Sequence, residues 1–569
     1  MSEFVIRNGH VFDPTQGIKG DKKDIAVKDG KIVEKVGSSA RVIDAKDKTV
    51  MAGAMEIHAH VAGPKVNAGR WYRPEDKHFD SHKTTGITRI EGGKSIPTVF
   101  KTGYEYARMG FTFAMEAAMP PLYARHVHEE IHDTPIIDEA ALPVLGNNWF
   151  ILEYLKNHEV ENTAAYISWV LRQTKGYGIK CVNPGGTEAW AWGLNCLTIH
   201  DPVPYFEITP AEIIKGLIEA NEYLGLPHSM HLHQNDLGNP GNYKTTIDSL
   251  KLAEGIKATN NFGREQVLHS THLQFHSYGG TNWGDFESKA KEVMDYVNKQ
   301  KNLTIDTGNV TLDETTTMTA DGPFEHHLHG LNHLKWFNVD VELETAAGIV
   351  PFIYDPANAV FCSQWAVGLE IPLYAKDPMR CFITTDHPNA GPFTRYPRVY
   401  SWLMSKKVRD ALLNGFKKAD KVIGATTLAE IDREITLYEL AAMTRAGPAK
   451  ALGLAKDYGG LRTGMNADIA IYNINPDKFP STGPEIEKAF AQVAYLFKDG
   501  KICVEDGKVV DMGHKKTFWV DAKVNENKQV MHDIREKFLR YYSVNENNYP
   551  VPESYAPHQH IISVDATKA

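Results

Sequence analysis

Short apolar runs alternate with amphipathic stretches through most of the chain. Runs typical of strands lie at 111–118, 141–146, 178–186, 227–235, 264–275, 302–310 and 380–389. Between them, apolar residues recur at helical spacing, as in 209–225, where a threonine cap and Pro210 open the predicted helix. With "MEIHAHV" as the first strand, the pattern predicts eight βα units in an α/β fold, a (β/α)8 TIM-like barrel.

Both ends of the chain show a different pattern, in which short alternating strands are separated by turns. "KDIAVKDGKIVEKVG" near the start has a counterpart in "AYLFKDGKICVEDGKVVD" near the end. This favours one small β-sandwich domain built from both termini. The predicted divisions are 1–51 and 461–520 for that domain, 52–460 for the barrel and 521–569 for a C-terminal helix and an extended docking tail. Long inserts at 64–105 and 311–379 are expected to cover the barrel mouth.

Charge and composition exclude several classes of function. A net charge of -9, with 62 basic residues scattered among 71 acidic ones, argues against a nucleic-acid partner. The amino terminus lacks the features of a signal peptide and no long apolar run follows, so we expect a cytoplasmic protein without a membrane span. The five cysteines form no C-x-x-C motif. Because an iron–sulfur cluster needs closely spaced thiolates, we expect no such cluster on this chain and no electron transfer by it.

Candidate metal ligands lie at the ends of the first, fourth and eighth predicted strands. His58 and His60 are two residues apart, so they point to the same side of a strand and suit a divalent metal such as zinc. Lys180 lies between apolar neighbours, where its pKa should fall and its neutral amine could take up carbon dioxide as a bridging carbamate. Asp386 in "TTDHPN" could bind metal and transfer a proton. Each feature alone has an ordinary structural explanation, but together they predict a metal site.

Two further strand ends add histidines. His231 and His233 repeat the two-residue spacing on strand five, and His269 and His272 follow on strand six. Five of eight strand ends would then carry ligand-type side chains, which packing alone does not explain.

This constellation resembles the amidohydrolase superfamily, and "VMAGAMEIHAH" and "AAMTRAGPAKALGLAKDYGGLRTGMNADIAIYN" resemble its opening and closing segments. The resemblance covers almost the whole chain. It implies two divalent metal ions, with zinc expected, and N6-carboxylysine at Lys180 between them. The implied ligands are His58, His60 and Asp386 on one metal, and His231 and His272 on the other.

The choice among the strand-five and strand-six histidines rests on local matches. "HLHQ" resembles the family's H-x-x-[EN], whose first histidine binds, so His231 precedes His233. "LHSTHLQ" resembles the L-H-x-x-H-[LV]-S of dihydroorotases, so His272 precedes His269.

Longer motifs narrow the resemblance to the A subunits of formylmethanofuran dehydrogenases: "HLHQNDLGNPGN", "THLQFHSYGG", "TMTADGPFEHH" and "TTDHPNAGPFTRYP". That family implies partner subunits with iron–sulfur clusters and a tungsten- or molybdenum-pterin, which make formate from CO2 in methanogenesis. The family's A-type chain reversibly condenses formate with the amine of methanofuran, and Asp386 is the implied proton carrier. The chain departs from many hydrolytic relatives at Gln234 and Asn235, where they keep an acid.

Residues near these motifs are candidate contacts for methanofuran: Gln274, His276, His327, His329 and Arg395. The alternative is that these side chains have no part in binding: the histidines would lie in surface loops, and Arg395 and Arg398 would form structural ion pairs. Because condensation needs concentrated formate, the inserts are expected to wall a path to the formate-producing partner.

Three functions remain open: the condensing member of a dehydrogenase complex, a hydrolase and a scaffold without activity. The hydrolase would be free-standing or part of a formyltransferase/hydrolase complex. The ligand set argues against the scaffold.

Overall fold

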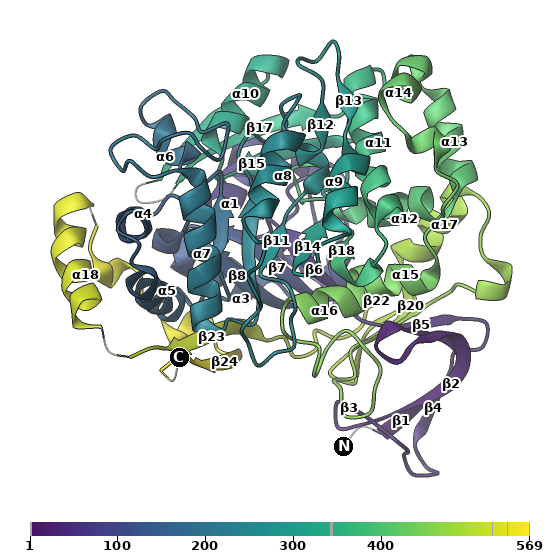
Figure 1. Cartoon of the computed structure of the whole chain (residues 1–569). Helices are drawn as coiled ribbons and strands as arrows, with labels where there is room; N and C mark the ends of the chain where they lie inside the picture. Colours follow the sequence, from purple (N-terminus) through teal and green to yellow (C-terminus); the bar gives the residue numbers. More distant parts are fainter. Residues whose placement is uncertain (1–2, 342–344, 526, 543, 568–569) are drawn as a thin grey trace.

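Eight parallel strands form the centre of the computed structural model, which describes residues 3–341, 345–525, 527–542 and 544–567 (Figure 1). They are β6 (Ala54–Ala59), β7 (Phe111–Met119), β8 (Asp138–Pro143), β9 (Lys180–Val182), β10 (Met230–His233), β11 (Leu268–Ser270), β14 (Leu303–Asp306) and β18 (Cys381–Phe382). β6 to β8 form one ladder and β9 to β18 another. Single bridges, Val144 to Lys180 and Ala59 to His387, join the two ladders. This is the strand order of the predicted barrel, and it confirms the predicted α/β fold class.

Helices cover the outside of these strands, as expected for parallel strands that are buried on both faces. They include α2 (Val99–Arg108), α3 (Ala124–Asp133), α4 (Trp149–Lys156), α5 (Val160–Thr174), α7 (Pro210–Leu224), α8 (Tyr243–Lys251), α9 (Ala290–Val297), α11 (Ala359–Tyr374), α12 (Tyr396–Met404), α13 (Lys406–Gly415) and α14 (Ala419–Ala425). α7 begins as the sequence predicts. Thr209 and Glu212 form a reciprocal capping box, Pro210 occupies the first turn, and Gly225 ends the helix in the left-handed conformation.

Strands from both ends of the chain pair in one sheet. Its members are β1 (Glu3–Asp13), β2 (Ile18–Lys28), β3 (Lys31–Val33), β4 (Arg41–Asp44), β5 (Thr49–Ala52), β19 (Ile469–Tyr472), β20 (Val493–Lys498), β21 (Lys501–Glu505) and β22 (Lys508–Val509). β5 and β19 pair antiparallel and connect the two halves. Figure 1 shows the first strands below the barrel, at the end away from α10 (Gly322–Asn332). A separate cluster of buried apolar side chains, which includes Val50, Ile469 and Phe497, forms the core of this sheet.

The last part of the chain returns to the barrel. β23 (Thr517–Lys523) pairs in parallel with β8, and β24 (Gln559–Asp565) pairs with β23. β23 therefore crosses the domain boundary that we predict at residue 520 and adds to a barrel ladder. α18 (Lys528–Tyr541) lies beside the outer helices, where Tyr154 of α4 donates a 2.9 Å hydrogen bond to Asp533. In the described residues, no helix has the length and hydropathy needed to cross a membrane.

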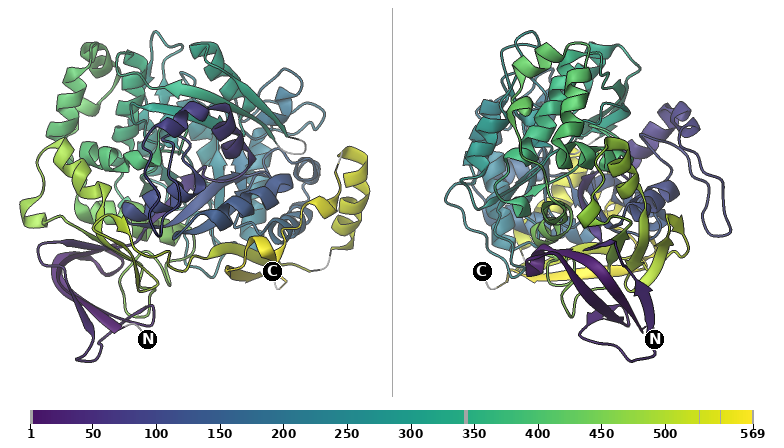
Figure 2. Two further views of the ribbon diagram at one scale, coloured as in Figure 1. Left: turned by 180° about the vertical axis from the view of Figure 1, so that it is seen from behind. Right: turned by 90° about the vertical axis from the view of Figure 1, so that its right-hand side faces the viewer.

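The two inserts form ordered elements at one end of the barrel (Figures 1 and 2). The first contains α1 (Pro64–Tyr72). The second contains β15 (Glu314–Thr319), α10 (Gly322–Asn332), β16 (Phe337–Val341) and β17 (Thr345–Ile353), of which the strands form a small antiparallel sheet. The inserts contact each other, since Tyr72 donates a 2.8 Å hydrogen bond to the carbonyl of Trp336.

Candidate functional site

The ends of β6 and β18 bring three predicted ligands together. His58 lies in β6, His60 follows it, and Asp386 lies in the loop after β18. Oδ1 of Asp386 is 3.1 Å from Nε2 of His58 and 3.5 Å from Nε2 of His60. All three side chains are buried. One carboxylate oxygen therefore faces one nitrogen of each imidazole, an arrangement in which a single cation could contact all three groups.

His233 and His272 form a second pair beside the first. Nδ1 of His233 is 3.1 Å from Nε2 of His272. The other nitrogen of His233, Nε2, is 3.0 Å from Oδ2 of Asp321. His58, His272 and Asp386 each bring one ligand atom within 4.8 Å of the others. The two groups of side chains are therefore adjacent at the carboxyl ends of the strands.

Lys180 is fully buried at the start of β9, and its Nζ has no hydrogen-bond partner in the described residues. Burial lowers its pKa to about 7, against the opposing effect of Asp386 and Asp306. A substantial fraction of this lysine is therefore a neutral amine near neutral pH. A neutral amine without a partner is suited to carbamate formation.

His231 and His269 lie one layer deeper in the barrel. In the parallel ladder, His231 is in register with Lys180 on one side and with His269 on the other. His233, two residues further along β10, lies closer to the mouth. Because a lysine side chain is long, its Nζ can extend from the deeper layer toward the layer of His233.

The ring nitrogens of these two deeper histidines already contact protein groups. Nε2 of His231 is 2.9 Å from Nδ1 of His58, and its Nδ1 is 3.0 Å from Nε2 of His228. Nδ1 of His269 is 2.9 Å from the hydroxyl of Thr304, and its Nε2 is 3.1 Å from Asp306.

Left-handed backbone conformations occur one to four residues after the ends of three strands that carry candidate ligands. The φ angle is 38° at Asn183, 33° at His272 and 45° at Asp386. Such angles are uncommon outside glycine and concentrate at functional sites. Gly308, at φ 63°, packs against the turn at His272, where an added Cβ would lie 2.4 Å from the Cβ of His272. These turns direct the chain away from the ladder and place the side chains at the mouth.

His276 joins the group, whereas Gln274 is engaged elsewhere. His276 is buried, its ring centroid is 5.3 Å from that of His272, and both of its nitrogens lack a hydrogen-bond partner in the described residues. It is therefore positioned to contact a bound molecule. Gln274 donates to the hydroxyl of Tyr278 and accepts from the backbone of Val310.

Two other candidate substrate contacts, His327 and His329, lie in the second insert, and His327 lines one cavity with Asp321, the carboxylate that contacts His233. His327 of α10 also lines a cavity of about 250 Å³ together with Phe275 and Tyr354. Nδ1 of His329 is 2.7 Å from the carbonyl of Leu334.

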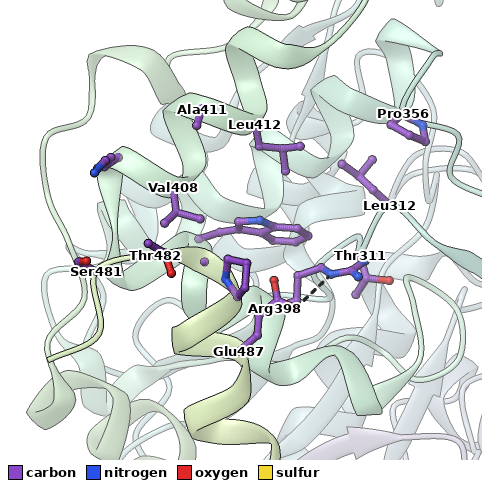
Figure 3. Close-up of a pocket in the computed structure, with 14 residues that line it drawn as sticks. Thr311, Leu312, Pro356, Arg398, Val408, Ala411, Leu412, Ser481, Thr482 and Glu487 are labelled. Atoms are coloured by element: carbon purple, nitrogen blue, oxygen red, sulfur yellow. Dashed lines mark ion pairs between the residues drawn. The ribbon is translucent and has the colours of Figure 1, made fainter. Parts of the chain in front are cut away.

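Arg395 and Arg398 both approach one carboxylate. Oδ2 of Asp313 is 2.6 Å from Nε of Arg395 and 3.5 Å from Nη1 of Arg398. Arg398 also lines a separate cavity of about 500 Å³ between α12, α13 and α17 (Gly483–Ala491), where it pairs with Glu487 (Figure 3). None of the predicted metal ligands lines that cavity.

Three carboxylates that contact the candidate histidines are not among the site residues predicted from the sequence. Besides Asp321 and Asp306, Glu116 places Oε1 3.3 Å from Nδ1 of His60 and accepts backbone hydrogen bonds from Val61 and Ala62 through Oε2. Each had a signal in the sequence. Glu116 interrupts a buried apolar strand, Asp306 ends one, and Asp321 precedes Gly-Pro at a helix start.

The donor set fits a pair of divalent metal ions. It offers imidazole nitrogens and a carboxylate, the ligand types that zinc prefers, and an unpartnered buried amine lies beside them. Burial lowers the pKa values of His58, His231 and His272 well below the usual range, so these imidazoles are neutral, as metal ligation requires.

Comparison with known proteins gives one family match, two similar sequences and one similar structure. The amidohydrolase family model matches residues 41–504. The chain is 54% identical to Protein FwdA of Methanocaldococcus jannaschii, over 99% of both chains. It is 33% identical to the A-type chain of the formyltransferase/hydrolase complex Fhc of Methylorubrum extorquens, over 97% of both. In the crystal structure of FhcABCD from that organism with methylofuran, a matching chain has a TM-score of 0.89 and 31% identity, with 99% of both chains covered.

Proposed function

The chain belongs to the amidohydrolase family, in its FwdA-type group, and from this premise we propose that it condenses formate with the primary amine of methanofuran. The products are N-formylmethanofuran and water, and the reaction is reversible. The observation that carries the proposal is the convergence of Asp386 with His58 and His60 beside the pair of His233 and His272. That geometry suits amide chemistry, and the similarity to FwdA over the whole chain supports the choice of substrate.

The proposed ligands of the two metals come from strand ends: His58, His60, Lys180, His233, His272 and Asp386. This set exchanges our first choice, His231, for His233. The exchange is supported by the nitrogen of His233 that faces His272 and by the carboxylate of Asp321 on its other nitrogen. Carboxylates or carbonyls commonly orient metal-bound histidines in this way. His231 also brings a ligand atom within 4.8 Å of His58 and Asp306. Its other nitrogen, however, faces the imidazole of His228, and no carboxylate or carbonyl orients it in the way that Asp321 orients His233.

Two divalent metal ions bound here would hold the formate oxygens and stabilise the negative charge that develops on them. Asp386 accepts a proton as the ammonium of methanofuran becomes the attacking amine. As the C–N bond forms and a C–O bond of formate breaks, Asp386 returns that proton to the departing oxygen. Together with the second proton lost from nitrogen, this gives one water for each formamide. Buried side chains around Asp386 exclude bulk water that would favour hydrolysis.

Condensation depends on a partner that supplies formate at high local concentration. The dispersed cysteines support a redox step on another chain of a complex. The inserts that contact each other through Tyr72 and Trp336 are candidates for the walls of the path. In the complete complex, we expect labelled formate from the bulk to be excluded from N-formylmethanofuran during CO2 turnover. Free entry of that label would contradict a closed path.

Hydrolysis of a formylated furan cofactor is the second candidate. It is favoured by the TM-score of 0.89 to a chain of the formyltransferase/hydrolase complex. The two functions share the site and differ in their partners. Purification from the native cells decides between them: a pterin-metal partner supports condensation, and a formyltransferase partner supports hydrolysis.

Substitution of Asp386 tests the assigned chemistry. In Asp386→Asn, we expect the rate of formamide formation and hydrolysis to fall by roughly 10²- to 10⁴-fold, the usual range for a lost acid–base group. Zinc analysis of the same samples measures whether both ions are retained, because Asp386 is also a proposed ligand, and rates are compared at saturating zinc. Asp236→Asn is the matched control, because Asp236 follows β10 at the same end of the barrel and contacts Asn239. Full activity of Asp386→Asn with both metals bound would refute the role of Asp386.

A further inference from the structure

Three buried imidazoles form a continuous chain from the candidate site into the base of the barrel. Nδ1 of His58 is 2.9 Å from Nε2 of His231, and Nδ1 of His231 is 3.0 Å from Nε2 of His228. Nδ1 of His228 is 2.8 Å from the backbone carbonyl of Ala451. At the other end, Nε2 of His58 faces Oδ1 of Asp386 at 3.1 Å. The relative exposure of each imidazole residue is 1% or less.

The carbonyl of Ala451 sets the direction in which the three imidazoles donate their hydrogen bonds. A carbonyl oxygen only accepts hydrogen bonds, so Nδ1 of His228 carries a hydrogen. A neutral imidazole carries one N–H, so Nε2 of His228 must accept, and Nδ1 of His231 must donate to it. By the same step, Nε2 of His231 accepts a hydrogen bond from Nδ1 of His58. The remaining nitrogen of His58, Nε2, is left with a lone pair and no hydrogen.

We infer that His228 and His231 are positioning residues that fix the tautomer of His58, so that its Nε2 lone pair faces Asp386. The inference rests on the proposed function, because that lone pair is the one with which His58 would bind metal. In the ordinary arrangement, one carboxylate or carbonyl sets the tautomer of a metal-binding histidine. Here two further imidazoles, hydrogen-bonded in series, connect the tautomer of His58 to a backbone carbonyl in the base of the barrel.

Two carboxylates act on His58 in opposite senses. In the metal-free chain, Asp386 favours a hydrogen on Nε2 of His58, whereas Asp306 supports the direction set by His231 and His228. Oδ2 of Asp306, a second acceptor, is 3.5 Å from Nδ1 of His58. It therefore also favours a hydrogen on that nitrogen. The carbonyl of Ala451 receives another hydrogen bond, 2.8 Å long, from Gln266. Loss of His228 would thus leave this carbonyl satisfied, and the effect of a substitution would fall on His231 and His58.

The test compares two histidine substitutions in the purified full-length chain. His228→Phe removes both ring nitrogens while it keeps an aromatic ring of similar size. His128→Phe is the matched control, because His128 is also buried and contacts a backbone carbonyl, that of Thr174 at 2.8 Å, in α3 on the outside of the barrel. Zinc dissociation constants are measured by competition with a chelator. We expect His228→Phe to weaken zinc binding about 10- to 100-fold, the usual cost of losing a group that orients a ligand, and His128→Phe to leave it unchanged.

His231→Phe separates positioning from direct ligation. We expect this variant to bind two zinc ions per chain at saturating zinc, with weakened affinity. Loss of one zinc ion at saturation, together with normal affinity in His228→Phe, would identify His231 as a ligand and overturn the inference.

A spectroscopic measurement reads the tautomer in the unsubstituted protein itself. Ring-nitrogen NMR of the metal-free, ¹⁵N-histidine-labelled chain reports the tautomer of His58, assigned by comparison with His58→Gln. We expect the hydrogen on Nδ1, and a hydrogen on Nε2 would overturn the inference. Neither measurement uses the condensation reaction. If His228→Phe is active and binds zinc with normal affinity, the positioning role alone is refuted. If His58 carries its hydrogen on Nδ1 but the unsubstituted protein does not act on formylmethanofuran, the proposed function alone is refuted.

Discussion

Oδ2 of Asp321 lies 3.0 Å from Nε2 of His233, so a residue of the second insert orients a histidine of the barrel. The other carboxylate oxygen of Asp321 accepts hydrogen bonds from Asn183 and from the backbone of Phe324 at the start of α10. The insert is therefore fastened to the ends of β9 and β10 through one carboxylate. It contributes to the site as well as covering it.

Substitution of Asp321 should loosen the second metal. In Asp321→Ala, His233 loses the acceptor that keeps a hydrogen on Nε2, so Nδ1 no longer presents its lone pair reliably. We expect zinc at this position to bind about 10- to 100-fold more weakly, measured by zinc content after dialysis against a chelator. Asp321→Asn keeps an acceptor and a helix cap, so its loss should be smaller. Equal zinc binding in Asp321→Ala and the unsubstituted chain would contradict the orienting role.

Gly308 should be intolerant of even one added methyl group. In Gly308→Ala, the new Cβ would meet the Cβ of His272 at 2.4 Å, far inside van der Waals contact, at a positive φ. We expect displacement of His272, loss of zinc and a lower thermal midpoint. Gly255→Ala is the matched control, because Gly255 has φ 76° and open space around its Cβ position, so it incurs only the backbone cost. A Gly308→Ala chain that retains both zinc ions and is no less stable than Gly255→Ala would show that the close contact is unimportant.

The buried carboxyl of Glu370 in α11 should make stability depend on pH. Burial raises its pKa to about 7, although Ser288 and Thr427 hydrogen-bond to it and oppose the shift. A carboxyl with a raised folded-state pKa favours the fold most below the unfolded value near 4.5, and this contribution is lost as pH rises to about 7. The change is on the order of 3 kcal/mol.

Glu370→Gln removes this ionisation and leaves the shape of the side chain nearly unchanged. The free energy of unfolding of the variant, relative to the unsubstituted chain, should therefore increase between pH 4.5 and 7.5. Denaturant unfolding at several pH values measures the difference. A difference that stays constant over this range would contradict the raised pKa of Glu370.

Much of the fold follows from local sequence pattern. The nine-residue apolar strand β7 and the capped helix α7 lie where the pattern predicts them, because each signal is contained in its own residues. The pattern overestimates the lengths of the short strands. β11 covers only Leu268–Ser270 within the predicted 264–275, because the chain turns out of the ladder at His272 with a φ of 33°. Hydrophobic pattern does not reveal such a turn.

The choice between His231 and His233 shows a second limit. Residues two apart on a strand point the same way, so spacing places both in the barrel but does not give their depth. Depth follows from the ladder register of His231 with Lys180, and orientation follows from Asp321, which is distant in sequence. The ligand set therefore stays a prediction in both its first and its revised form.

Formamide chemistry at the site around Asp386 can be followed with an isotope of oxygen. The purified, zinc-loaded chain is incubated with N-formylmethanofuran in H₂¹⁸O, where hydrolysis is the favoured direction. We predict that the protein releases methanofuran and formate that carries one ¹⁸O. In Asp386→Asn, this release should be largely abolished. If the zinc-loaded chain releases no formate while the complete complex formylates methanofuran, the site around Asp386 does not carry out the formamide chemistry.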